Sequence, residues 1–337
     1  MLAAHDFAVM LNANARRVTP EVRRKVEKIV APENVYYSHS QAESKDIVKE
    51  IAARRFPTVF TGGGDGTFIQ FVNDYAKAAP RSGAQALPAK VGVLHLGTGN
   101  AVAQMVSSGN FECDLQSFVH TKTSDYQPLH LVQAEGASFP FAGMGIDAEL
   151  LNDYVALKSG VGSTRWGRPL FQNLGGYFAA FFGRTMTRRM WQAVSAAPKA
   201  EIKITNLGDC AYILRGGEPV KAYGRGEVLY EGPMTTTIFG TCPYYGHGLT
   251  ILPYSTQRAG YFQLRTIRMG MAKALSRLPS LWNGTYEGGD VYDWHVKQVK
   301  IETSIPVPYQ FGGDGQGYRS ELEVGLAPLQ VNLLRFI

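Results

Sequence analysis

The stretch TVFTGGGDGT at residues 58–67 joins a short apolar run to a glycine-rich turn, and it decides the fold of the first half of the chain. Its apolar start is typical of a buried strand, and apolar residues at helical spacing after Thr67 predict a helix. A glycine-rich turn between a strand and a helix usually receives an anion such as phosphate, because bare N–H groups of the backbone approach it closely. Gly62, Gly63 and Gly64 are therefore expected to form an anion cradle, with a tight structural turn as the alternative.

Asp65 places a carboxylate in the middle of this turn, where it would repel bare phosphate. The carboxylate is useful there if it contacts phosphate through Mg²⁺ or water, or if it accepts hydrogen bonds that fix the loop. The sequence leaves both roles open. The turn is neither the G-x-G-x-x-G dinucleotide fingerprint nor a P-loop, because no Gly-Lys-Ser/Thr follows it.

The turn lies within a regular alternation of strand-like and helix-like segments over the first 125 residues. The expected strands are FAVMLN, NVYYS, PTVF and KVGVLHL, and helical spacing of apolar residues marks the segments between them. This rhythm predicts a doubly wound, largely parallel α/β sheet. Ligands bind such sheets at the carboxyl ends of the strands, where we expect the loops at Asn12, residues 62–67 and residues 97–100.

The loop LGTGN at residues 96–100 is a second glycine-rich turn, which follows the next expected strand. The backbone at Gly97 and Gly99 carries no side chain that would obstruct a ligand. Side chains that can form hydrogen bonds at the start of a helix are those of Thr98 and Asn100. An ordinary helix cap is the alternative for this loop alone. Two such loops on consecutive strands of one sheet favour a binding site.

The rhythm changes after about residue 125 to short, β-rich segments separated by glycine. These segments predict an antiparallel sandwich or barrel. We therefore expect an α/β domain over residues 1–126 and a β-rich domain over residues 127–325, which a basic helical insertion interrupts at about 150–195. A length of 337 residues suits two domains.

The insertion is basic and aromatic. Between Tyr154 and Ala200 it carries seven basic residues and no acidic one, which exceeds the net charge of +6 of the whole chain. This pattern suits an anionic membrane surface, whereas no recognised nucleic-acid motif accompanies it, and a helix with a solvated basic face is the alternative. The candidate membrane residues are Arg165, Arg168, Arg184, Arg188 and Arg189.

Composition and motifs argue against several other classes of protein. No stretch reaches the roughly 20 apolar residues that span a bilayer, and the N-terminal MLAAHDFAVMLNANARR lacks the pattern of a signal peptide. Cys113, Cys210 and Cys242 lie far apart, which argues against disulfides and a zinc site. We therefore expect a cytoplasmic protein with peripheral membrane association.

Six motifs, taken in order, resemble the diacylglycerol kinase and sphingosine kinase catalytic superfamily. They are VMLNANAR, GGGDGT, LGTGNAVAQ, GMGIDAEL, CPYYGHGLTILPYS and FGGDGQ, which begin at residues 9, 62, 96, 143, 242 and 311. The resemblance covers nearly the whole chain and implies a lipid kinase that uses ATP and Mg²⁺. It also implies an NAD-kinase-like N-terminal domain and a β-rich C-terminal domain, with the final strand at about 326–337 returning to the first domain.

The resemblance further implies roles for individual residues. Asp314 matches the aspartate that acts as catalytic base, although Asp-Gly is also a strong hairpin signal, so a plain turn position is the alternative. Asp65 is the candidate metal contact, directly or through water. The expected nucleotide-binding residues are Asn12, Gly62, Gly63, Gly64, Asp65, Gly66, Thr67, Gly97, Thr98, Gly99 and Asn100.

The sequence departs from the family pattern at several positions. Ala13 replaces the usual proline of the first loop, and Ala101 stands where many diacylglycerol kinases carry aspartate, as in the sphingosine kinase form. Gln316 replaces the glutamate of a D-G-E motif. Arg258 and Ala259 replace carboxylates, which argues against the structural Mg²⁺ site of some bacterial members.

The sequence leaves three functions open. A kinase acting on diacylglycerol or a sphingoid base at an anionic membrane is the leading one. NAD kinase shares the G-G-D-G-T loop, but LGTGN takes the lipid kinase form and the late Asp-Gly is present. A lipid-binding regulatory protein on a kinase scaffold is motivated by Ala259 and Gln316. Neither the acceptor lipid nor the oligomeric state, with a homodimer as one option, follows from the sequence.

Overall fold

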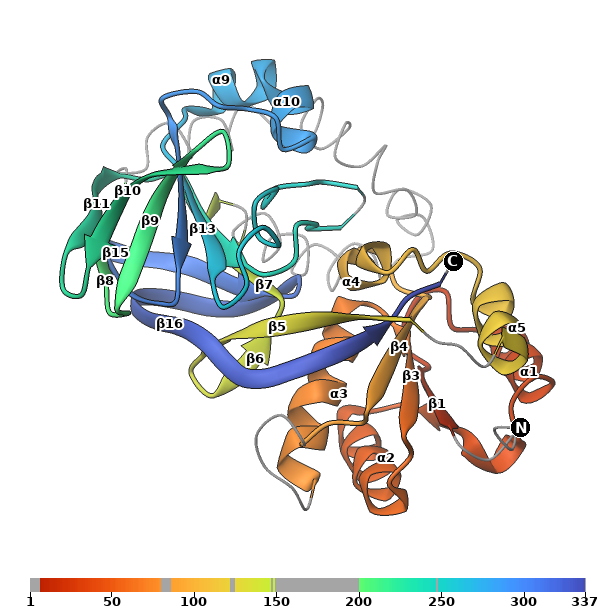
Figure 1. Ribbon diagram of the computed structural model, residues 1–337. Coiled ribbons are helices and arrows are strands. Elements are labelled where there is room, and N and C mark those ends of the chain that lie inside the picture. Colours follow the sequence, from red (N-terminus) through yellow and green to blue (C-terminus); the bar gives the residue numbers. More distant parts are fainter. Residues whose placement is uncertain are drawn as a thin grey trace.

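The computed structural model describes residues 7–79, 86–121, 125–146, 148, 200–246 and 248–336, which form an α/β part followed by a β-rich part (Figure 1). The α/β part holds parallel strands in the order β4-β3-β1-β2. These strands are β1 (Phe7–Asn12), β2 (Val35–Ser38), β3 (Thr58–Gly63) and β4 (Lys90–His95). The helices are α1 (Pro20–Glu27), α2 (Gln41–Arg54), α3 (Asp65–Ala78), α4 (Ala101–Met105) and α5 (Phe111–Thr121), with a 3₁₀ turn at Pro32–Asn34.

Helices cover both faces of this sheet, so residues 7–11 of β1 are all buried. Ala8 and Met10 lie in the core that includes residues of α2 and α3, whereas Val9 and Leu11 lie in the core that includes residues of α1 and α5. Figure 1 shows the two pairs of helices on opposite sides of the strands. The doubly wound α/β fold expected from the alternation is therefore confirmed.

Side chains cap the N-termini of α1 and α2. The Thr19 hydroxyl accepts a hydrogen bond from the N–H of Val22 at 3.2 Å, and Pro20 takes the first helical position. The Ser40 hydroxyl accepts from the N–H of Glu43 at 3.1 Å. Each cap satisfies an N–H group that the helix itself leaves without a partner.

The β-rich part is antiparallel, as expected. Its strands from β5 to β15 pair antiparallel with one another and with β16. The strands are β5 (Tyr126–Ala134), β6 (Ala137–Phe139), β7 (Phe141–Gly145), β8 (Glu201–Asn206), β9 (Cys210–Arg215), β10 (Glu218–Gly224), β11 (Val228–Pro233), β12 (Thr236–Gly240), β13 (Phe262–Ile267), β14 (Val291–Val296), β15 (Gln298–Phe311) and β16 (Asp314–Leu334). Two short helices, α9 (Met271–Ser276) and α10 (Leu278–Trp282), lie between β13 and β14.

The long strand β16 connects the two parts. It pairs with β15 at its start and with β5 farther along, and Leu333 near its end lies beside Val91 of β4 in a parallel pairing. Figure 1 shows β16 running from the β-rich part to the edge of the α/β sheet. The sheet is therefore continuous from β10 to β2.

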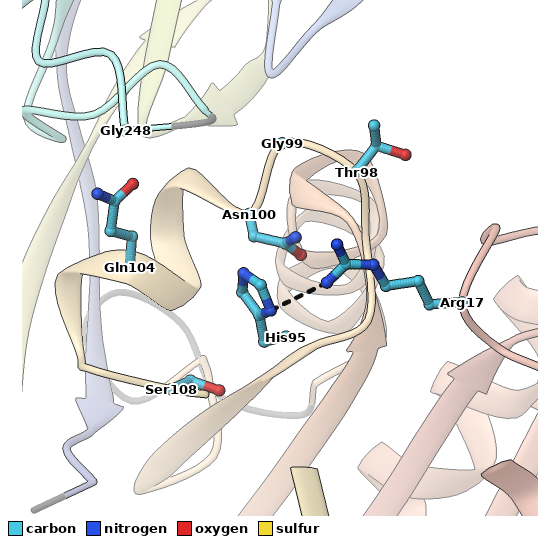
Figure 2. A pocket seen from close by; sticks show the side chains of 8 residues that line it. All are labelled: Arg17, His95, Thr98, Gly99, Asn100, Gln104, Ser108 and Gly248. Atoms are coloured by element: carbon cyan, nitrogen blue, oxygen red, sulfur yellow. Dashed lines mark hydrogen bonds between the residues drawn. The ribbon is translucent and has the colours of Figure 1, made fainter. Parts of the chain in front are cut away.

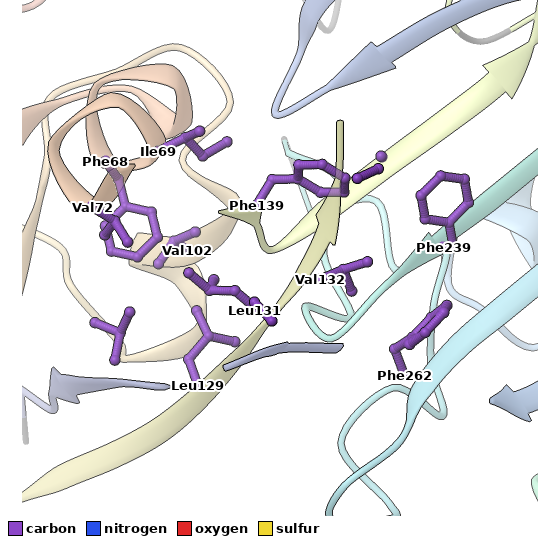
Figure 3. Close-up of a cluster of buried hydrophobic side chains, with 14 of the residues drawn as sticks. Phe68, Ile69, Val72, Val102, Leu129, Leu131, Val132, Phe139, Phe239 and Phe262 are labelled. Carbon is purple, nitrogen blue, oxygen red and sulfur yellow. The ribbon is translucent and has the colours of Figure 1, made fainter. Parts of the chain in front are cut away.

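One hydrophobic core also runs through both parts. Phe68 of α3 and Val102 of α4 belong to the same buried cluster as Leu131 of β5 and Phe239 of β12 (Figure 3). The division predicted at residues 126/127 stays a prediction, since β5, the first strand of the β-rich part, begins at Tyr126 and shares this core with α3 and α4.

The predicted basic insertion is not part of this description. Arg165, Arg168, Arg184, Arg188, Arg189 and the helical segment expected at about 150–195 lie outside the described residues. Within the ranges given above, no helix combines the length and the hydropathy that a bilayer crossing requires.

Candidate functional site

The glycine loop after β3 is closely packed from both sides. A methyl group on Gly62 would lie 2.4 Å from Cδ2 of Leu11, and one on Gly63 would lie 2.3 Å from Oγ1 of Thr67. Gly64 is the N-cap residue of α3 and offers no side chain as a cap. The loop therefore brings bare backbone to the N-terminus of a helix of 14 residues, which is a favourable place for an anion.

Asp65 fixes the next loop through its carboxylate. Its Oδ2 accepts a hydrogen bond from the N–H of Ala101 at 3.1 Å, and its Oδ1 accepts from the N–H of Val102 at 3.0 Å. The side chain is buried, and burial raises the pKa of Asp65 while the N–H groups of Val102 and Ala101 oppose that rise. The structure thus shows the loop-fixing role for this carboxylate, and its contact with Mg²⁺ stays a prediction.

The second glycine loop is closed by Asn100. Its Oδ1 accepts from the N–H of Gly97 and its Nδ2 donates to the carbonyl oxygen of Gly97, both at 2.8 Å. Asn100 has a φ of 55°, in the left-handed region that asparagine tolerates. A methyl group on Gly97 would lie 2.2 Å from the Cα of Gly64, so the two glycine loops are in direct backbone contact.

The first loop joins them through Asn12 at the end of β1. Its Nδ2 donates to Oγ1 of Thr67 at 2.9 Å, and its Oδ1 accepts from the N–H of Asn14 at 3.0 Å. The structure therefore brings together all three loops that the sequence predicted at the carboxyl ends of the strands.

A segment of the β-rich part packs against the second loop. Gly246 has a φ of 102°, and a methyl group on it would lie 3.0 Å from the Cα of Gly99. The Cys242 thiol donates to the carbonyl oxygen of Ala101 at 3.8 Å, and burial raises its pKa. Cys242 is therefore an inert structural thiol, as a buried cysteine usually is.

A cavity of about 330 Å³ opens beside these loops (Figure 2). The guanidinium of Arg17 donates from Nη1 to Nδ1 of His95 at 3.2 Å, since a guanidinium offers no acceptor. Among the described residues, the lining holds the positive charge of Arg17 and no carboxylate side chain, which favours an anionic ligand. The lining residues are Arg17, His95, Thr98, Gly99, Asn100, Gln104, Ser108 and Gly248.

Asp314 comes to the glycine loop from the hairpin of β15 and β16. Gly312 and Gly313 form the turn with φ of 58° and 87°, the combination that type I′ hairpins require. Asp314 then pairs with Phe311 as the first residue of β16. Gly312 and Gly313 therefore take the two central positions of the turn, since glycine adopts positive φ readily, and Asp314 follows them directly.

The exposed carboxylate of Asp314 lies against the start of α3. A methyl group on Gly66 would lie 2.7 Å from Oδ2 of Asp314. Gln316, which follows in the same strand, donates from its amide to the carbonyl oxygen of Asp314 at 3.1 Å. The candidate catalytic base and the candidate nucleotide loop therefore meet at Gly66.

The described residues do not offer a protein-built metal cage. Within the described ranges, no three His, Cys, Asp or Glu side chains gather as metal ligands. Arg258, which replaces a carboxylate of the family pattern, has its guanidinium 3.9 Å from the ring centre of Tyr212 and 4.7 Å from that of Tyr261. A cation bound there would meet this guanidinium instead of a carboxylate.

Sequence reasoning missed part of the cavity. It did not select Arg17, His95, Gln104, Ser108 or Gly248. His95 ends β4 directly before LGTGN, so the carboxyl-end rule that selected the loop could also have found it. Gln104 and Ser108 become part of the lining only through the short helix α4 and the turn after it.

Comparisons with known proteins agree with this geometry. Residues 7–131 match the family model of the diacylglycerol kinase catalytic domain. The fold resembles three solved structures from Bacillus anthracis str. Sterne. Two of them are of a presumed diacylglycerol kinase, with sequence identities of 14% and 15% and TM-scores of 0.64 and 0.65. The third is of a diacylglycerol kinase, with a sequence identity of 13% and a TM-score of 0.60. Each alignment covers 98% of this chain and 97% of the other.

A search of curated proteins found no match. At these identities the solved structures establish the fold alone, and the family model adds the similarity of residues 7–131 to a known type of domain. Residues 7–131 are thus similar to the diacylglycerol kinase catalytic domain, and the fold as a whole is similar to that of these solved structures.

Proposed function

We propose that the protein is an ATP- and Mg²⁺-dependent lipid kinase that transfers the γ-phosphoryl group to a hydroxyl of a membrane lipid, either diacylglycerol or a sphingoid base. The observation that carries the proposal is the position of the Asp314 carboxylate against Gly66 of the glycine loop. Phosphoryl transfer requires a phosphate cradle and a group that takes the proton of the acceptor hydroxyl, and these two elements meet there.

The nucleotide would lie along the two glycine loops. Gly64 carries no side chain at the N-terminus of α3, so backbone N–H groups there can approach phosphate closely. Arg17 adds a positive charge in the adjoining cavity of about 330 Å³. Asn12 and Asn100 keep the loops in register through their hydrogen bonds to Thr67 and Gly97.

Mg²⁺ fits a site of this kind when phosphate supplies most of the ligands. Magnesium in phosphate-transfer enzymes uses one or two carboxylates with phosphate oxygens and water. Oδ2 of Asp65 lies 3.0 Å from a methyl group placed on Gly99, which lines the cavity, so a water-mediated contact is the metal role we assign to it. The bound ion would neutralise charge on the transferred group.

Asp314 would act on the acceptor. An exposed carboxylate at the tip of a hairpin is open to a hydroxyl that approaches from solvent or from a membrane surface. Because the transition state is loose, a carboxylate is basic enough to take the proton. The basic segment with Arg165, Arg168, Arg184, Arg188 and Arg189 would hold the enzyme at an anionic bilayer.

The test is a transfer assay with labelled ATP, Mg²⁺ and mixed micelles that carry diacylglycerol, sphingoid bases, phosphatidylglycerol, ceramide or undecaprenol, with NAD in a parallel reaction. We expect a labelled lipid that disappears when a chelator removes Mg²⁺. Labelled NADP with no lipid product would replace the proposal by NAD kinase. ATP binding without transfer to any acceptor would favour a lipid-binding regulatory protein.

A further inference from the structure

The tip of the β15–β16 hairpin is held from inside the protein by one buried amide, that of Gln310. Its side chain is fully buried. Its Oε1 accepts a hydrogen bond from the N–H of Gly313 at 3.0 Å, and its Nε2 donates to the hydroxyl of Tyr245. Both ends of the amide are therefore used, and one of them holds the residue directly before Asp314.

The tip needs such a support because glycine alone does not fix it. Gly312 and Gly313 have no side chains and lose more conformational freedom on folding than other residues. Two contacts hold Gly312 in place. Its N–H donates to the carbonyl oxygen of Phe141 at 3.1 Å, and it contacts Ile69 of α3. Gln310 supplies the hydrogen bond to Gly313, the second residue of the turn.

The other end of the amide reaches the segment that covers the second glycine loop. Tyr245 lies between Cys242, which bonds to Ala101, and Gly246, which contacts Gly99. Its ring also packs on Phe141, with 4.9 Å between ring centres. One continuous set of contacts therefore runs from the loop at residues 96–100 through Tyr245 and Gln310 to the turn that carries Asp314.

We propose that Gln310 is a positioning residue, which sets the place of the Asp314 carboxylate relative to the glycine loop through Gly313 and Tyr245. This inference rests on the proposed function. Gln310 is buried and acts through Asp314 without touching the substrate. Its removal therefore changes the rate of transfer and leaves ATP binding as it is.

The test is a double-mutant cycle between Gln310→Met and Asp314→Asn, read by labelled phosphate transfer at high enzyme concentration. Methionine keeps the length of the side chain and removes both hydrogen bonds. We expect Gln310→Met to lower kcat about 10- to 100-fold, since small misplacements of catalytic groups have effects of this size, and to leave KM for ATP within about twofold. In the Asp314→Asn background the same change has no further effect, because its target is already gone.

Two further variants keep the test independent of folding defects. Gln298→Met is the same substitution at an exposed position of the same strand and leaves kcat unchanged. Tyr245→Phe keeps the ring on Phe141 and removes the hydroxyl, so it gives a smaller loss than Gln310→Met. Equal losses from Gln310→Met in both backgrounds would mean a purely structural role and would overturn the proposal, as would wild-type kcat.

Hydrogen exchange at the hairpin separates this inference from the proposed function. Gln310→Met removes the acceptor of the Gly313 N–H, so exchange of that amide accelerates, whereas Gln298→Met leaves it unchanged. A wild-type protein that transfers no phosphate would defeat the kinase proposal, and the Gly313 amide would still show whether Gln310 holds the Asp314 turn. An unchanged exchange rate in Gln310→Met would overturn the inference in either case.

Discussion

The tetrapeptide Gly-Gly-Asp-Gly occurs twice in this chain, at residues 63–66 and 312–315, and its two aspartates end in opposite environments. In the first copy Gly64 has φ of −96° and ψ of −174°, and the chain enters α3 with Asp65 buried. In the second copy both glycines have positive φ, and the chain reverses into β16 with Asp314 exposed.

The comparison shows that the surrounding segments decide what the four residues do. Apolar residues at helical spacing follow the first copy, so a helix packs on the sheet and the carboxylate is enclosed beside Ala101 and Val102. Two pairing strands flank the second copy, so the glycines must form the tight turn. The first aspartate is therefore buried within the site, and the second is exposed at its edge.

The largest effect on stability is expected from Asp65→Ala. This change leaves the N–H groups of Ala101 and Val102 buried without their acceptor, and we expect it to lower the free energy of unfolding by roughly 2–4 kcal/mol. Urea denaturation measures the loss. Asp314→Ala is the matched control at the exposed copy, with an expected change within about 0.5 kcal/mol. Equal losses from both would contradict the contrast drawn here.

A second pair of variants tests the backbone of the two copies. Gly312→Ala forces a side chain onto a residue with φ of 58° and against Cδ1 of Ile69 at 2.1 Å, so we expect a loss of about 1–3 kcal/mol. Gly64→Ala has an ordinary φ, and the nearest atom to the new methyl group lies at 3.6 Å. We expect less than about 1 kcal/mol there. Thermal unfolding measures the stability of both variants. A larger loss in Gly64→Ala than in Gly312→Ala would contradict this explanation.

The smallest effect on stability is expected from Gly66→Ala, at the point where the two copies are in contact. This change is expected to lower turnover. The methyl group of Gly66→Ala would displace the Asp314 carboxylate, whose Oδ2 would lie 2.7 Å away. We expect kcat to fall about 10-fold with unchanged stability, because the carboxylate can move at little cost to the fold. Gly109→Ala, which meets no atom within 4 Å, is the control. Unchanged kcat in Gly66→Ala would show that this contact does not matter for transfer.

Much of the fold follows from the sequence for physical reasons. The alternation of apolar strands and amphipathic helices predicted the parallel sheet, and short segments punctuated by glycine predicted the antiparallel part. The caps at Thr19 and Ser40 are local features of the same kind, because their partners lie three residues away. Elements set by near neighbours are therefore the ones that a single sequence reveals.

The site was less predictable because its partners are distant in the sequence. The choice between the two roles of Asp65 depended on N–H groups 36 and 37 residues away. The contact of Asp314 with Gly66 and the bond from Gln310 to Tyr245 join segments that only the folded chain brings together. Asp-Gly and Gly-Gly are both strong turn signals, so the sequence did not decide which pair would form the hairpin turn.

The most direct test of the central claim measures ATP affinity and lipid phosphorylation separately in the wild-type protein and in Asp314→Asn. If the first Gly-Gly-Asp-Gly copy holds the nucleotide and the second acts on the acceptor, the variant binds ATP within about twofold of wild type. Its kcat falls by about 10²–10⁴, the usual contribution of a general base. A variant that still phosphorylates lipid at the wild-type rate would contradict the account.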